Sequence, residues 1–288
     1  MTLAGAAHEQ LEGAALAGMV PTIAKERAGV TCSADTEQNV RRHLYLAFGL
    51  FAYLWFVGTF VYSVGFLGNF GVQRTVDSGP HAAAPGWALL INCGLLSLFA
   101  VQHSWMARRS FKAFTRRFVP ESLERSVYVC AASATMHLLF WEWRPIPWIL
   151  WRVASPSGQA ALWVTYTVGW LIVLACCFIM SHAHLFGMGQ VWAYWRGRPY
   201  REPEFRMSFA YRYVRNPQML GFLMAFWAAP TMTFGRFLLA VFSTAYVLLA
   251  LTFEQRDLLH RLGAPYAQYC KQTALLIPRP WRRFKVPT

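Results

Sequence analysis

One histidine stands among polar residues at the end of a long apolar run, in the stretch "LFAVQHSWMARRSFK". Gln102, His103 and Ser104 lie just inside the apolar boundary, where polar groups cost free energy unless they are hydrogen-bonded or in contact with water. The cluster therefore indicates a cavity with an imidazole in it. The alternative is a polar helix end, in which Arg108 and Arg109 touch lipid phosphate.

A second polar stretch, "SHAHLFGMGQVWAYWRGRPYREPEFRMSFAYRYVRNP", follows the fourth apolar run. Its His182 and His184 would point to different faces of a helix, which argues against a shared metal ion. Aromatic faces can hold a flat ring and guanidinium groups can hold its carboxylate or phosphate. The stretch thus indicates a binding loop, and the alternative is an ordinary amphipathic interfacial loop.

The end of this stretch reads Arg215-Asn216-Pro217. Pro217 suits the first turn of a helix, where its missing N–H costs nothing. The free N–H groups of that turn and the helix dipole favour negative charge. The motif therefore predicts a binding floor at a helix start.

A carboxylate follows near the carboxyl end, in "LLALTFEQRDLLHRLGAPYAQYCKQ". Glu254 lies at the apolar boundary, where an isolated carboxylate favours a cationic or hydroxyl-rich partner. The alternative is a salt bridge to Arg212 or Arg215. Tyr266 and Tyr269 are expected to share one face of the next helix.

The elements that must position these residues are membrane helices. Apolar residues make up 56% of the chain, more than a soluble domain needs. A helix needs about 20 apolar residues to cross a hydrocarbon core of about 30 Å. Runs of this kind occupy residues 44–70, 86–107 and 153–181. Another run, 126–141, is interrupted by "WEWRPIPW" but reaches Trp151.

A further apolar stretch, 216–253, is split by "AAPTMTFGR" into arms of about 13 and 17 residues, or about 20 and 25 Å. This pattern predicts a short helical hairpin with Pro230 and Gly235 at its tip. The sequence therefore predicts an all-α bundle of five to six transmembrane segments, the last two forming the hairpin.

Charge predicts the orientation of the bundle. Of the 27 basic residues, 23 lie in segments 1–42, 107–126, 181–216 and 254–288. Because short cytoplasmic loops retain Lys and Arg, both termini are expected in the cytoplasm. The net charge of +14 then faces anionic lipid headgroups. Loops tied this closely to membrane spans exclude nucleic acid as the expected partner.

The remaining features are a set of cysteines and an N-terminal extension. The six cysteines show no metal-type C-x-x-C spacing and are interpreted as packing residues rather than a disulfide set or zinc site. Residues 1–40 lack the features of a secretory signal. We expect a short surface helix there and a loose linker at 29–36, before a membrane domain at 41–288.

The C-terminal motifs resemble those of the isoprenylcysteine carboxyl methyltransferase superfamily: an Arg-x-Pro that opens a hairpin, an acidic boundary residue and "RLGAPYAQYC". Within that superfamily, "VQHSWMARRSFK", "ESLERSVYV", "RNPQMLGFLMAFWAAPTMTFG" and "FEQRDLLHRLG" resemble the methanethiol S-methyltransferases, near the NnrU-like proteins. The resemblance covers residues 42–280. Asn216 departs from it, because many members carry histidine between Arg and Pro, so no imidazole can act there.

The resemblance implies an enzyme of the bacterial inner membrane that binds S-adenosylmethionine from the cytoplasmic side. It would convert a small thiol, methanethiol, into dimethyl sulfide, and it would need no metal. A base near the acceptor would help, because simple alkyl thiols are weaker acids than cysteine, whose pKa is about 8.5. His103 is the first choice for that base, followed by His184 and His182.

Cofactor-binding residues follow from the same resemblance. Arg215, Asn216 and Pro217 would form the floor, and Gln190 and Tyr211 the wall. Arg212 or Arg256 would bind the methionyl carboxylate. Glu254 would accept from the ribose hydroxyls or the ammonium group.

Three other functions stay open at this point: carboxyl methylation of a prenylated cysteine, a non-catalytic NnrU-like accessory or transport role, and a membrane reductase. A transporter is disfavoured because the ionisable groups collect at one face instead of near the midplane. A reductase is disfavoured because the chain shows no dinucleotide-binding fingerprint.

Overall fold

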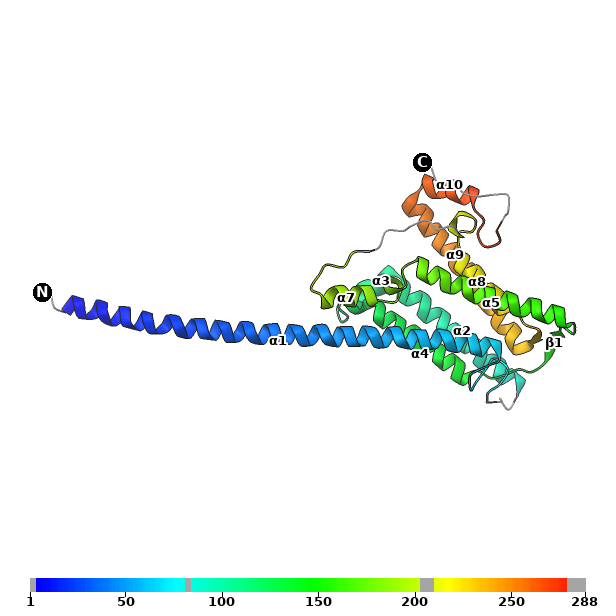
Figure 1. Cartoon of the computed structure of the whole chain (residues 1–288), viewed down its shortest axis with the longest axis horizontal. Helices are drawn as coiled ribbons and strands as arrows, with labels where there is room; N and C mark the ends of the chain where they lie inside the picture. The colour runs from blue at the N-terminus through cyan, green and yellow to red at the C-terminus, as the bar shows by residue number, and fades with distance from the viewer. Residues whose placement is uncertain (1–3, 81–83, 203–209, 279–288) are drawn as a thin grey trace.

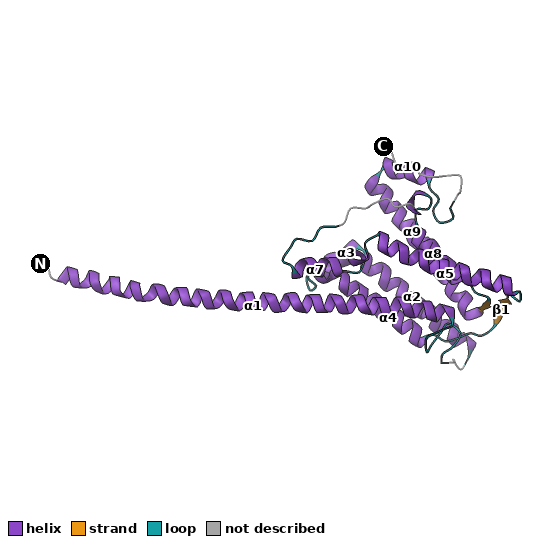
Figure 2. Ribbon diagram, viewed as in Figure 1, coloured by secondary structure: helices purple, strands orange, loops and turns teal. Residues whose placement is uncertain are grey.

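Helices account for nearly all the regular structure of the protein (Figures 1 and 2). The structure is a computed structural model that describes residues 4–80, 84–202 and 210–278. Its long helices are α1 (Ala4–Gly68), α2 (Pro85–Ala107), α4 (Glu124–Glu142), α5 (Pro156–Ile179) and α9 (Phe234–Leu262). The shorter helices are α3 (Arg109–Thr115), α6 (His182–Leu185), α7 (Met188–Trp195), α8 (Pro217–Trp227) and α10 (Ala264–Gln272). The other elements are the single turns η1 (Glu121–Leu123) and η2 (Ala210–Arg212) and the strands β1 (Ile149–Arg152) and β2 (Thr231–Thr233).

Four of these helices are long and apolar enough to cross a membrane: residues 36–68 of α1, together with α2, α5 and α9. Large apolar side chains on them face outward, as on Leu44, Val61, Leu90 and Val164, each more than 60% exposed. Such faces are stable against lipid and not against water. The prediction of a helical integral membrane protein is therefore confirmed.

The N-terminal segment differs from the prediction. α1 runs without a break from Ala4 to Gly68. The prediction of a loose linker at 29–36 is therefore wrong, because the backbone there is helical. The N-terminal part of α1 projects away from the rest of the molecule (Figure 1). The division of the chain near residue 40 stays a prediction.

α8 is shorter than the arm expected for the hairpin and packs chiefly along α5. The two helices approach closely at Gly169 and Gly221, where a Cβ on Gly221 would lie 2.6 Å from the Gly169 carbonyl oxygen. Small residues allow membrane helices to pack backbone against backbone in this way. α5 therefore holds α8 in place, and β2 connects α8 to the start of α9.

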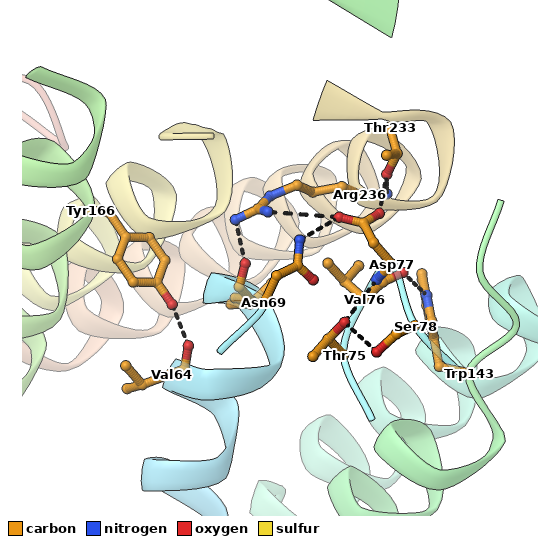
Figure 3. A network of polar contacts seen from close by, with 11 residues as sticks. Val64, Asn69, Thr75, Val76, Asp77, Ser78, Trp143, Tyr166, Thr233 and Arg236 are labelled. Carbon is orange, nitrogen blue, oxygen red and sulfur yellow. Dashed lines mark hydrogen bonds and ion pairs between the residues drawn. The ribbon is translucent and has the colours of Figure 1, made fainter. Parts of the chain in front are cut away.

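A polar network closes one end of the bundle (Figure 3). Arg236, only 3% exposed, donates to the Leu67 carbonyl and lies 3.9 Å from the Asp77 carboxylate. Asp77 also accepts from Asn69 at 2.6 Å and from Thr233. The network therefore joins the loop after α1 to the first turn of α9, which Thr233 caps.

Like Arg236, three other arginines lie outside the four basic segments of the sequence, and they lie at the same end of the bundle as Arg236. Arg74 lies over the ring of Trp141 at 3.8 Å, and Arg144 pairs with Glu142 at 2.7 Å. Arg152 ends β1, which pairs antiparallel with β2. These residues therefore share one end of the bundle, as the charge distribution predicts, and the polar groups singled out for chemistry belong to the other end.

Candidate functional site

The predicted site residues fall into three contact groups at the ends of the helices. The first group joins the start of α8 to the C-terminal part of α9 and to α10. The second surrounds His103 at the end of α2. The third lies where α6 and α7 meet α4.

The first group is completed by a segment that sequence reasoning missed. Residues 273–275 run beside the Arg-Asn-Pro motif, with a parallel bridge between Val214 and Ala274. The Arg215 backbone N–H donates to the Ala274 carbonyl at 2.9 Å, and the Asn216 amide donates to the Leu275 carbonyl at 3.4 Å. Pro217 begins α8 as predicted. The motif is thus held by chain that lies nearly 60 residues later.

The Arg215 side chain reaches α9 and α10. Its Nη1 donates to Gln255 Oε1 at 2.9 Å and to Cys270 Sγ at 2.8 Å. Its Nε is buried and has no hydrogen-bond partner in the described part of the chain. Arg215 and Cys270 line an open pocket of about 690 Å³ with residues 271 and 273–277. Cys270 therefore lines a pocket, which the interpretation of the cysteines as packing residues did not anticipate.

Tyrosines form the neighbouring wall. The Tyr269 hydroxyl donates to the Tyr211 carbonyl at 2.7 Å, and the rings of Tyr266 and Tyr269 lie 6.0 Å apart, as their predicted common face requires. Burial, reinforced by nearby Cys176, raises the pKa of Tyr211 to about 12. Burial likewise raises the pKa of Tyr266 to about 12. Both phenols are therefore neutral at pH 7 and act as hydrogen-bonding groups, not bases.

Three further charged residues are predicted for the first group: Glu254, Arg212 and Arg256. Glu254 is exposed on α9 and, among the described residues, forms no ion pair with Arg212 or Arg215. The salt-bridge alternative is therefore wrong. Arg212 lies in η2 with its Nε buried and unpartnered within the described ranges. Arg256 is exposed on α9.

The second group is built around His103. The Tyr128 hydroxyl on α4 lies 3.0 Å from both ring nitrogens of His103, and the ring of Phe99 stacks on the imidazole at 5.2 Å. Ser104 shares a 3.0 Å hydrogen bond with Tyr246 of α9. The polar cluster read from the sequence is therefore hydrogen-bonded, and Tyr128 and Tyr246 are partners that sequence reasoning missed.

Helix α9 connects the first two groups. Tyr246 belongs to the His103 group and Gln255 to the Arg215 group, about 14 Å apart along the axis at 1.5 Å per residue. A signal for both tyrosines was present in the sequence, because Tyr128 and Tyr246 interrupt apolar runs. That signal did not reveal the partner of either residue.

The third group contains the remaining predicted residues. His184 stacks on Tyr200 at 5.6 Å, and its pKa is lowered, first by burial and then by Arg125. Gln190 is buried, and its amide is best satisfied by donating to the Gly187 carbonyl at 3.1 Å and accepting from Arg125 at 3.2 Å. The polar contacts of Gln190 are thus with Arg125 of α4 and with Gly187 at the start of α7, and not with Tyr211, its predicted companion.

His182 lies against aromatic rings rather than polar groups. Its ring is 4.9 Å from Phe178 and 6.2 Å from Tyr53. His182 and His184 thus contact different neighbours, as their spacing predicts.

Comparison with known proteins identifies relatives along most of the chain. It is 48% identical over 245 residues to a methanethiol S-methyltransferase of Mycobacterium tuberculosis, covering 84% of this chain and 99% of that protein. It is 40% identical over 248 residues to methanethiol S-methyltransferase 1 of Bradyrhizobium diazoefficiens, covering 86% of each chain. Human nurim is 30% identical over 203 residues, covering 63% of this chain and 76% of nurim.

No family model matches the chain, and no solved structure matches it. Membership therefore rests on these relatives, which match 84% and 86% of this chain. The resemblance to methanethiol S-methyltransferases that the motifs indicate is confirmed. The chain belongs to the methanethiol S-methyltransferase family.

Proposed function

We propose that the protein transfers a methyl group from S-adenosylmethionine to methanethiol, forming dimethyl sulfide at the membrane. The observation that carries the proposal is the 48% identity with the M. tuberculosis relative, since the alignment covers 99% of that protein. Two contacts support it physically. These are a hydrogen-bonded imidazole in an apolar helix and an arginine, its Nε buried, that lines an open pocket.

The residues around Arg215 fit a donor that carries a carboxylate, an ammonium group and an adenosine. The buried Nε of Arg215, and that of Arg212, lack a partner within the described residues and so offer charge-assisted hydrogen bonds to a carboxylate. Neutral Tyr211 and Tyr266 offer ring faces. Glu254, exposed nearby, complements an ammonium or ribose hydroxyls. Asn216, Pro217 and Arg256 complete the proposed set at Arg215, and Gln190, predicted for the same set, lies in the third contact group.

When bound, S-adenosylmethionine supplies a methyl group on a positively charged sulfur, which departs as a neutral thioether. The protein binds and orients the two reactants and excludes water from them. His103 accepts the thiol proton, and Tyr128 orients the imidazole that does so. His184 and His182 are the next candidates for the base.

We further propose the membrane arrangement that suits this chemistry. α4 and α8 join the four apolar helices to give six membrane segments, with α8 and α9 as the hairpin. Both termini lie in the cytoplasm of a bacterial cell, with the basic segments against the inner leaflet. The donor pocket then opens to the cytoplasm, where the donor is made.

Purified protein in detergent should form labelled dimethyl sulfide from methanethiol and methyl-labelled S-adenosylmethionine. Calorimetry should detect binding of S-adenosylhomocysteine and not of NADPH. Turnover of a prenylated cysteine without turnover of methanethiol would assign the chain to carboxyl methylation. Binding of neither cofactor would favour an accessory or transport role.

Replacement of Arg215 by alanine should weaken S-adenosylhomocysteine binding about 10- to 100-fold, because a hydrogen bond to a charged group contributes about 1.5–3 kcal/mol. Isothermal titration calorimetry measures this change. Arg198→Ala is the matched control, since it removes the same charge from an exposed position on the loop after α7. Equal affinity of wild type and Arg215→Ala would remove Arg215 from the donor site.

A further inference from the structure

A second, smaller pocket lies between the end of α2, helix α3 and the start of α4, and no role has been assigned to it. Its volume is about 200 Å³. Most of its lining is apolar and includes Met106, Phe111, Val119 and Val127, with the aromatic ring of Tyr128 beside them. A space of this size and polarity suits a short alkyl group.

The pocket is connected to the polar cluster of α2 through two of its lining residues. The Tyr128 hydroxyl lies 3.0 Å from both ring nitrogens of His103. The Met106 sulfur accepts a hydrogen bond from the Gln102 amide at 3.0 Å. A ligand in the pocket would therefore lie one side chain away from the imidazole.

Charge around the pocket favours an anion. The carboxylate of Glu124 is neutralised by Lys112 at 3.0 Å and by Arg116 at 3.6 Å. Arg125 also lines the pocket, and the group it meets on α7 is the neutral amide of Gln190 at 3.2 Å. The local balance is therefore positive, which lowers the free energy of a thiolate relative to a thiol.

We infer that this pocket is the acceptor site, that it holds a small alkyl thiol, and that Phe111 limits the length of its alkyl group. The inference rests on the proposed function and names the substrate-binding part of the same site. The thiol gives its proton to the Tyr128 hydroxyl, which lines the pocket, and that hydroxyl gives its own proton to a ring nitrogen of His103. A lone pair of the thiol sulfur forms the bond to the methyl carbon, and the electron pair of the broken bond stays on the donor's sulfur.

Replacement of Phe111 by alanine tests the inference through substrate selectivity. The ratio of kcat/KM for propanethiol to that for methanethiol should rise about 10-fold or more, since each methylene accommodated by an apolar pocket changes this ratio about 10-fold or more. Phe114→Ala is the matched control. It removes the same side chain from the same helix at a position that is 59% exposed and does not line the pocket.

A second variant fills the pocket instead of enlarging it. Val119 lies in the loop before η1, where a larger side chain costs little packing energy. Val119→Phe should raise KM for methanethiol several-fold and leave S-adenosylhomocysteine affinity as in wild type. If one variant fails to bind S-adenosylhomocysteine and is therefore misfolded, the other decides.

The experiments distinguish a wrong function from a wrong assignment of the acceptor pocket. Wild-type protein without methanethiol turnover would overturn the proposed function. Active wild-type protein, combined with unchanged selectivity in Phe111→Ala and unchanged KM in Val119→Phe, would overturn the pocket assignment alone. Unchanged values in both variants would also be the result if the pocket holds a lipid chain.

Discussion

Replacement of His103 by alanine should lower the turnover of methanethiol about 100- to 10,000-fold, the usual contribution of a general base. Binding of S-adenosylhomocysteine should stay within about twofold of wild type, because His103 contacts Tyr128 and Phe99 rather than the Arg215 group. Steady-state kinetics with gas chromatography of dimethyl sulfide measures the first quantity, and calorimetry measures the second.

His260→Ala provides the control for this variant, since it removes an exposed imidazole from α9. A loss of affinity without a loss of turnover would exclude His103 as the base. A large loss in His184→Ala instead would move the role to His184.

The pH profile gives a separate test of His184 as the base. Burial and Arg125 lower the pKa of His184 below its usual 6.5, so this imidazole stays neutral, and able to accept a proton, as the pH falls through 6.5. If His184 were the base, turnover would decline only below pH 6.5.

Replacement of Arg236 by leucine should reduce the free energy of unfolding by about 3–5 kcal/mol, the cost of removing one partner of a buried ion pair. The variant leaves the negative charge of Asp77 without its ion-pair partner and the Leu67 carbonyl without its hydrogen-bond donor. Denaturant unfolding in detergent, followed by tryptophan fluorescence, measures the change.

Arg152→Leu is the control, because it removes an exposed arginine from β1 at the same end of the bundle. Adding Asp77→Asn to Arg236→Leu should recover part of the loss, since no charge is then left unpaired. Equal stability of wild type and Arg236→Leu would show that the network in Figure 3 does not hold α9 to the loop after α1.

The apolar helices and the residues that begin a helix could be predicted from the sequence, because both depend on residues that are close together in the chain. The four apolar helices, the position of Pro217 at the start of α8 and the common face of Tyr266 and Tyr269 are of this kind. The linker at 29–36 was wrong because Gly29 only weakens a helix locally, and the structure continues α1 through it.

The partners of the site residues could not be predicted, because they depend on how the helices pack. His103 and Tyr128 are 25 residues apart and Arg215 and Cys270 are 55 apart, and no periodicity relates either pair. The same limit applies to Gln190. The family resemblance places it in the wall beside Tyr211, whereas its contacts in the folded chain are with Gly187 and Arg125.

The segment at 273–275 has a consequence for how the protein is made. Because this segment pairs with Arg215 and lines the pocket there, that pocket cannot form until the chain has been synthesised past the segment and has turned back. Each nascent chain therefore begins to enter the bilayer without this pocket. It gains the pocket only after all four apolar helices have been synthesised.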